Sequence, residues 1–208
     1  LYEEKMLSTD NPLKLTVIPM KGWNRDMRFS DTGLPWVLPS PHIPSPETAV
    51  FYPATGIAGE LDYLSIGVGY TMPFRTFAAT WIDGSKLADN LNALQLSGIA
   101  FRPISYKPYY GFGKGLNLNG VEMYVTDFDK AELTLVQFYV MQELARMYPA
   151  HKAAAGADPK RFGMFDKVCG SKSVRRDFFK NHRVEDIEKL WHKDLPVFEK
   201  TKHKYHIY

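Results

Sequence analysis

Residues 121–147 read VEMYVTDFDKAELTLVQFYVMQELARM, and the hydrophobic period of this stretch changes part of the way along. In residues 121–127, apolar Val and Met alternate with Glu, Tyr and Thr, a period of two that is typical of a β-strand. From Asp129, a residue suited to an N-cap, apolar residues recur every three or four positions as far as Met147. The stretch therefore predicts a strand followed by the longest helix of the chain.

Strand-like and loop-like segments precede this stretch, and helical segments follow it. Further short strands are predicted at residues 14–20, 49–53 and 99–106. An amphipathic helix is predicted at residues 85–94, and three more helical segments are predicted at residues 162–170, 171–181 and 184–193. Pro196 kinks the last of these or begins another helix. This order predicts an α+β fold with a mixed sheet, long loops rich in Pro and Gly, and a helical C-terminal third.

The composition is that of a globular chain that can bury a sizeable core, with 208 residues of which 45% are hydrophobic. No apolar run approaches the roughly 18 residues that span a bilayer, so no transmembrane segment is expected. Residues 151–208 hold 14 Lys and Arg against 8 Asp and Glu, whereas residues 1–150 hold 12 against 15. The basic side chains of the tail have acids between them at helical spacing, as on a solvated helix, so no nucleic-acid partner is expected.

One segment, FSDTGLPWVLPSPHIPSP at residues 29–46, contains five prolines together with Trp36 and His42. Prolines fix the backbone and remove hydrogen-bond donors, so the segment is predicted to be a stiff surface path able to wall a cleft. The alternative is a crossover loop whose Trp36 fills the core. Loops of similar composition recur at residues 55–74 and 107–115, and binding residues concentrate on such loops.

Several motifs resemble those of one protein family. They are GW followed by R-x-M-x-F-x-DTGLPWV-x-PSP at 22–41, YP-x-TG at 52–56, S-x-G-x-G-x-T-x-PF at 65–74, WIDG at 81–84 and G-x-x-FRP at 98–103. Together they are similar to the C-terminal domain of the exo-β-N-acetylmuramidase family, long catalogued as a domain of unknown function. Its members remove terminal N-acetylmuramic acid from bacterial peptidoglycan fragments. The resemblance runs from about Leu13 to Tyr208.

This resemblance implies a domain organisation and a location for the chemistry. It implies a preceding Rossmann-like domain, with the active site in the cleft between the two domains. Residues 1–12, which read like the end of a helix, would be the remnant of that domain, and residues 13–208 the C-terminal domain. The catalytic glutamates of the family belong to the preceding domain, so the resemblance places no catalytic residue in this chain. It implies a muropeptide or amino-sugar ligand and a location in the cell envelope. The residues themselves predict no cofactor and no metal, because GFGKG precedes a strand-like stretch and His203 and His206 have no acid nearby.

Candidate substrate-binding residues come from the loops and from the family motifs. They are Asp31, Trp36, Ser40, His42, Glu60, Tyr70, Arg102 and Tyr110. Two of them have structural alternatives, because Asp31 could bond its own backbone in a turn and Glu60 could be a solvated loop acid.

The chain departs from the family pattern at four positions. Ile66, Val68 and Met72 stand where the family run S-E-G-R-G-T-T-R-PF has an acid and two arginines, and His42 stands where the family has the Asn of PSPN. Arginine binds carboxylates through two parallel hydrogen bonds, and N-acetylmuramic acid carries a lactyl carboxylate. These departures predict an altered specificity. They also leave open a non-catalytic cell-wall saccharide-binding or scaffold protein that keeps the fold.

Overall fold

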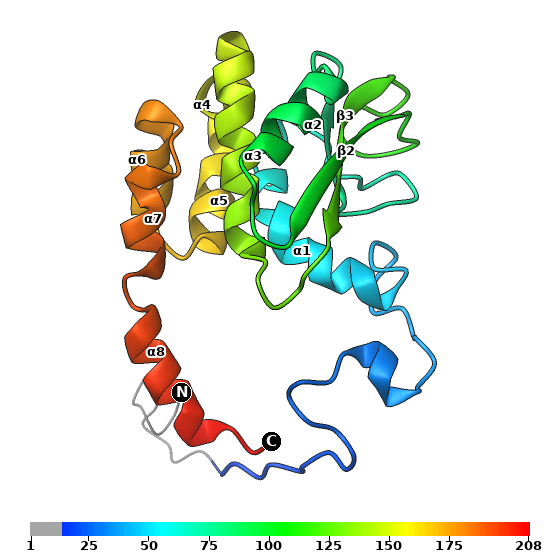
Figure 1. Ribbon diagram of the computed structural model, residues 1–208, viewed down its shortest axis with the longest axis vertical. Coiled ribbons are helices and arrows are strands. Elements are labelled where there is room, and N and C mark those ends of the chain that lie inside the picture. Colours follow the sequence, from blue (N-terminus) through cyan, green and yellow to red (C-terminus); the bar gives the residue numbers. More distant parts are fainter. Residues whose placement is uncertain (1–13) are drawn as a thin grey trace.

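A computed structural model describes residues 14–208 and contains one three-stranded sheet. The strands are β1 (Thr76–Ala79), β2 (Ile99–Tyr106) and β3 (Leu118–Val125), with β3 in the centre (Figure 1). Both outer strands pair antiparallel to β3. The α+β class is confirmed, but the sheet is antiparallel, not mixed. The reason is that β3 separates β1 from β2, so the two strands that run in the same direction never pair.

Three helices form the layer that packs against the sheet: α1 (Pro46–Gly59), α2 (Gly84–Ala93) and α3 (Leu133–Met147). Asp83 caps α2 by accepting a hydrogen bond from the backbone of Lys86, as expected from the IDG turn. Side chains on one face of the sheet enter the main core with those of the helices, among them Phe77, Phe101, Val121, Met123, Leu87, Leu91 and Phe138. The loops lie on the other side of the strands (Figure 1).

The last third of the chain is helical, as predicted. Its helices are α4 (Ala153–Gly156), α5 (Phe162–Val168), α6 (Lys172–Asn181), α7 (Glu185–His192) and α8 (Leu195–Lys202). Short 3-10 turns lie at Phe29–Thr32, Pro149–His151, Pro159–Arg161 and His203–Tyr205. Phe138 of α3 contacts the rings of Phe165, Phe178 and Trp191, which attaches α5, α6 and α7 to the body. Pro196 stands in the first turn of α8, so it begins a new helix.

Three local predictions were wrong. Residues 14–20 form no strand, because they extend along the surface with no strand beside them to pair with. Residues 49–53 lie inside α1, where Ser45 is the N-cap and Pro46 the first residue. α3 begins at Leu133 with Glu132 as its N-cap, not at Asp129. The predicted end of a helix at the start of the chain lies outside the described residues.

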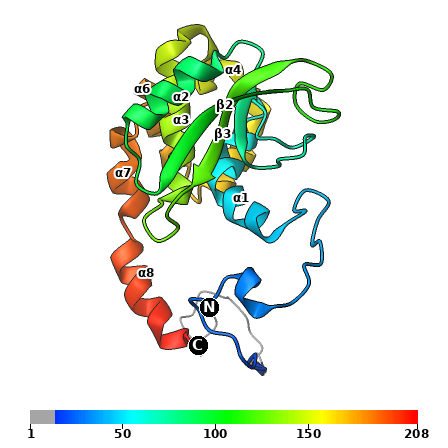
Figure 2. The same ribbon diagram turned by 45° about the vertical axis from the view of Figure 1, so that its right-hand side comes forward.

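The two ends of the described chain leave the body and meet. Figures 1 and 2 show residues 14–28 and the segment after α8 side by side, away from the sheet. The backbone N–H of Met20 donates to the hydroxyl of Tyr208 at 2.6 Å, and the ring of Trp23 contacts the ring of Tyr208 edge-on. These two arms, residues 14–28 and residues 195–208 with α8 included, expose large apolar side chains, among them Leu15, Ile18, Val197 and Phe198. In residues 14–208, no helix has the length and apolar character that a membrane crossing needs.

Candidate functional site

The face of the sheet that is turned away from the main core carries a polar centre, and we call it the outer face. Thr76 of β1 and Arg102 of β2 both pair with Glu122 of β3, so their side chains emerge on this face. Ala78 and Gly120, each two residues farther along its strand, also pair with each other and lie on the same face. The outer face thus combines a charged group near the start of β1 with an apolar patch farther along the strands, formed by Ala78, Tyr106, Leu118, Tyr70, Ile104 and Phe112.

Glu122 is the centre of an ion cluster, and only 1% of its surface is exposed. Arg102 donates to Oε2 of Glu122 through Nε at 2.8 Å and lies 2.6 Å away through Nη2. Tyr124 donates its hydroxyl to the same oxygen at 2.9 Å. Hydrogen bonds to Glu122 and its negative charge raise the pKa of Arg102 above its ordinary value. A buried carboxylate needs such partners, and here they hold Glu122 in place as an anion.

Arg75 adds a second guanidinium to this cluster. Its Nη2 lies 3.3 Å from Oε1 of Glu122. The guanidinium also lies over the rings of Phe51 and Tyr124, at 4.6 and 5.5 Å from their centroids. Its Nε is buried and has no hydrogen-bond acceptor among residues 14–208. Two cations therefore face one anion.

A chain of hydroxyl groups continues from the cluster along the outer face. The hydroxyl of Tyr106 lies 2.8 Å from Oγ1 of Thr76 and donates to Oγ of Ser65 at 2.8 Å. Burial raises the pKa of Tyr106 above its ordinary value. The ring of Tyr70 stacks on that of Tyr106 with 4.4 Å between centroids. Ser65, Thr76 and Tyr106 are buried, so this chain of hydroxyl groups adjoins the ion cluster inside the molecule and is not part of its surface.

The proline segment and the two Gly-rich loops meet at the edge of the outer face. Gly69 lies against the backbone of Tyr110. The carbonyl of Gly69 accepts a hydrogen bond from the backbone N–H of Tyr109 at 2.9 Å. The hydroxyl of Tyr110 lies 2.7 Å from Nδ1 of His42. The hydroxyl of Ser40 accepts from the backbone of His42 at 3.3 Å. The structure thus brings together three of the predicted residues, Ser40, His42 and Tyr110, at the contact between the loops.

Trp36 lies in a pocket at the start of α1 and does not fill the core. The pocket has a volume of about 460 Å³ and is lined mainly by apolar side chains, including Phe29, Trp36, Pro46, Val50 and Phe128. The ring of Phe29 contacts that of Trp36 edge-on, and the indole Nε1 donates to the carbonyl of Ile43 at 3.3 Å. An amphipathic ring in a half-open pocket is suited to bind the apolar face of a ligand.

Two predicted residues have other roles in the structure. The carboxylate of Asp31 accepts a hydrogen bond from the backbone of Arg28 at 2.8 Å and closes the turn at Phe29–Thr32. Glu60 follows the last residue of α1, where its carboxylate lies 3.8 Å from Nη2 of Arg161 and its carbonyl accepts from Arg161 Nε. Both contacts agree with the structural alternatives. Substrate binding by any of the eight residues stays a prediction.

The sequence indicated only part of this site. Alternation in residues 121–127 placed Glu122 and Tyr124 on the polar side of a strand, and Arg102 came from a family motif. Sequence reasoning missed six residues that build the outer face: Ser65, Arg75, Thr76, Tyr106, Glu122 and Tyr124. The signal for Glu122 was present, but the strand register that supplies its partners was not.

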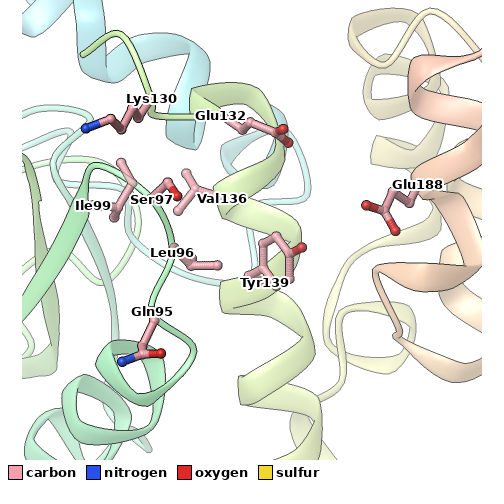
Figure 3. Close-up of a pocket in the computed structure, with 9 residues that line it drawn as sticks. All are labelled: Gln95, Leu96, Ser97, Ile99, Lys130, Glu132, Val136, Tyr139 and Glu188. Carbon is pink, nitrogen blue, oxygen red and sulfur yellow. The ribbon is translucent and has the colours of Figure 1, made fainter. Parts of the chain in front are cut away.

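Other concavities lie on the helical side of the molecule. Figure 3 shows one between α3, α7 and the loop before β2, lined by Leu96 and Val136 together with Glu132, Tyr139 and Glu188. Burial and nearby glutamates raise the pKa of Tyr139 above its ordinary value. No predicted site residue lines this pocket. Within residues 14–208 no three His, Cys, Asp or Glu side chains gather as a metal site requires, so no metal centre is proposed.

Comparison with known proteins connects this chain to characterised and solved relatives. The chain is 39% identical over 194 residues to the peptidoglycan beta-N-acetylmuramidase NamZ of Bacillus subtilis strain 168, an alignment that covers 93% of this chain and 45% of that protein. The crystal structure of a DUF1343 family protein from Bacteroides fragilis NCTC 9343 is 50% identical and superposes with a TM-score of 0.96, over 99% of this chain and 53% of the other. The chain therefore spans about half the length of these relatives.

Two family models match the chain in succession. The model described as the N-terminal part of exo-beta-N-acetylmuramidase NamZ matches residues 2–47, and the model of the C-terminal part matches residues 50–208. The two matches meet near the start of α1, so the proline segment at residues 29–46 falls wholly within the first. A family match is not a structural boundary, so the division predicted between residues 12 and 13 stays a prediction, as does a preceding Rossmann-like domain. The match over residues 50–208 shows that the chain belongs to the exo-β-N-acetylmuramidase family.

Proposed function

We propose that this chain forms one side of the saccharide site in a bacterial glycoside hydrolase that releases terminal N-acetylmuramic acid from peptidoglycan fragments. The observation that carries the proposal is a scaffold shared with a named muramidase that displays the exposed ends of Arg75 and Arg102, the loop contact between Tyr110 and His42, and the half-open pocket of Trp36. Rigid sheets that display polar groups beside aromatic rings are suited to bind sugars.

The residues of this side of the site have different tasks in the proposed complex. The ring of Trp36 would pack on the apolar face of a sugar, and the pocket around it has room for an acetyl or lactyl methyl group. His42, Tyr70 and Tyr110 would supply hydrogen bonds from the loop edge. The prolines between residues 35 and 46 keep this edge ordered before the sugar arrives, which lowers the entropy lost on binding.

Hydrolysis of a glycosidic bond requires a proton donor and a second carboxylate on opposite sides of the bond. Glu122 does not meet this requirement, because Arg102, Arg75 and Tyr124 occupy its oxygens. Asp31 and Glu60 are engaged in a turn and an ion pair. We therefore propose that the catalytic carboxylates come from the preceding domain, and that the exposed apolar side chains of the two arms pack against that domain.

This division of labour predicts that residues 1–208 alone hydrolyse no N-acetylmuramide. The chain supplies a binding surface, but a lone surface lacks the acid and the nucleophile or base. Purified residues 1–208 and the full-length protein are to be compared on an aryl β-N-acetylmuramide, with release of the phenol as the readout. Turnover by residues 1–208 at the full-length rate would place the catalytic carboxylates inside this chain.

Trp36→Ala tests the aromatic pocket. Because Trp36 is half-buried in a surface pocket, we expect a loss of about 1 kcal/mol in the free energy of unfolding, near the average for point mutations. Saccharide affinity should fall by about 2 kcal/mol or more, as for an aromatic anchor. Trp191→Ala is the matched control, because Trp191 packs on Phe138 in the core and its loss should cost about 3–5 kcal/mol of stability. A large stability loss in Trp36→Ala with affinity intact would return Trp36 to a purely structural role.

The four departures from the family pattern favour a second candidate function. Ile66 and Val68 pack against the core, so this loop no longer offers the charged groups of the family run. A protein with altered sugar specificity, or one that binds cell-wall saccharides without turnover, would have the same fold. Measuring binding and hydrolysis on the same full-length protein separates these cases. For either function the ligand comes from the cell wall, so we propose a location in the cell envelope.

A further inference from the structure

We propose that Arg75 and Arg102 together form a carboxylate-binding site on the outer face, and that this site takes the lactyl carboxylate of a terminal N-acetylmuramic acid. The choice of ligand rests on the proposed function. The existence of an anion site rests on the geometry of the cluster alone.

The charge balance of the cluster leaves a cation available. Glu122 is almost completely buried, whereas 30% of the Arg75 side chain and 56% of the Arg102 side chain are exposed. One guanidinium with two bonds to a carboxylate is enough to balance a buried anion. The second guanidinium gives the cluster an excess of one positive charge, and the cluster meets solvent through its cationic members.

The donors of the two arginines are only partly used. A guanidinium has five N–H donors, and Arg102 directs Nε and Nη2 at Glu122. Arg75 contacts Glu122 through Nη2, and its buried Nε has no acceptor in residues 14–208. That buried Nε is out of reach of a ligand, so a ligand would meet the exposed ends of the two guanidinium groups. The remaining donors match the two oxygens of a ligand carboxylate.

Both guanidinium groups are held in position before a ligand arrives. Arg75 lies over the rings of Phe51 and Tyr124. Arg102 also lies over the ring of Tyr124, 5.6 Å from its centroid. The hydroxyl of Tyr124 is itself bonded to Glu122. Stacking of this kind restricts the long side chains, so that less entropy is lost when an anion binds.

The cluster is connected through the chain to the other predicted contacts. Phe51, which lies under Arg75, is next in sequence to Val50, and Val50 lines the Trp36 pocket. Thr76 pairs with Glu122 and contacts Tyr106, whose ring stacks on that of Tyr70. Arg102 belongs to the family motif at residues 98–103, so this site is distinct from the arginines missing from residues 65–74.

The test compares two sugars that differ in the lactyl group. Full-length protein is titrated calorimetrically with N-acetylmuramic acid and with N-acetylglucosamine. We expect N-acetylmuramic acid to bind at least about tenfold more tightly, as a charge-assisted hydrogen bond provides. In Arg75→Gln the difference should shrink to about twofold, with the affinity for N-acetylglucosamine unchanged. In Arg75→Gln, Glu122 still pairs with Arg102, so the fold should persist. Arg75→Lys keeps the positive charge but not the planar guanidinium, so it should lose part of the preference for N-acetylmuramic acid.

Arg146→Gln is the matched control, because Arg146 is also an exposed partner of a buried glutamate, Glu143, but lies on α3. It should leave the preference intact. Three results would each overturn the proposal. The first is equal or absent binding of the two sugars to the unmodified protein, and the second is an undiminished preference in folded Arg75 variants. The third is an equal loss of affinity for both sugars in those variants, which would assign Arg75 to the contact with the preceding domain. Hydrolysis is measured separately. Preferred binding of N-acetylmuramic acid without hydrolysis would refute the proposed hydrolase activity and support the carboxylate site. Hydrolysis without preferred binding would support the hydrolase activity and refute the carboxylate site.

Discussion

Replacing Glu122 with Gln should lower the free energy of unfolding by about 3–5 kcal/mol, the usual cost of removing one partner from a buried ion pair. The substitution preserves the shape of the side chain but removes the negative charge that Arg75 and Arg102 share. Two guanidinium groups would then repel each other at the centre of the outer face, with the buried Nε of Arg75 still unpaired. The damage should extend to β1 and β2, since both strands are bridged through this residue.

Calorimetric melting of the full-length protein measures this effect. Asp177→Asn is the control, because Asp177 pairs with Arg176 and Lys180 at the surface, where water replaces lost ion pairs. It should leave the melting temperature unchanged. Combining Glu122→Gln with Arg75→Gln removes one of the unpaired cations, so the double variant should melt above Glu122→Gln alone. A Glu122→Gln protein as stable as the unmodified one would show that the cluster contributes nothing to the fold.

Gly69→Ala should destabilise the loops that carry the predicted saccharide contacts. Gly69 has a φ of +90°, which costs a residue with a side chain about 1–3 kcal/mol. In addition, a Cβ at this position would overlap the carbonyl oxygen of Tyr110. The backbone of residues 107–115 would have to move, and with it the contact between Tyr110 and His42. We therefore expect a combined loss above about 3 kcal/mol and a weakened affinity for N-acetylmuramic acid.

Gly115→Ala separates the two causes. Gly115 has a similar φ of +76°, but nothing lies within 4 Å of the position of its Cβ. Its substitution should show the backbone cost alone and leave saccharide affinity intact. Chemical denaturation gives the stabilities and calorimetric titration the affinities. Equal effects of the two substitutions would mean that contact between the loops is unimportant.

Features that depend on neighbouring residues could be predicted from the sequence. The three-and-four spacing up to Met147 predicted α3, and the amphipathic pattern at residues 85–94 predicted α2. Alternation predicted β2 and β3. The motifs identified the family, and the family match bears this out. Each of these signals is complete within a short window, because helix and strand periods arise from local backbone geometry.

Residues 49–53 show where local signals compete. Their β-branched and aromatic side chains favour a strand, yet Ser45 and Pro46 begin a helix that runs through Pro53. What stabilises the helix lies far along the chain: the side chain of Gln137 on α3 accepts from the backbone of Ala58 and donates to the carbonyl of Pro53. This pair of hydrogen bonds satisfies backbone groups near the proline, and no window around residue 50 contains it.

By itself, the sequence determined the α+β class, the helical last third, the family and the polar side of the strand at 121–127. Only the tertiary structure decided that Arg75 and Arg102 converge on Glu122, that Tyr110 meets His42, and that Asp31 and Glu60 contact Arg28 and Arg161. The physical reason is that the strand register brings together residues 20 and more positions apart. Periodicity fixes which face a side chain occupies, whereas the packing of the whole chain selects its partner.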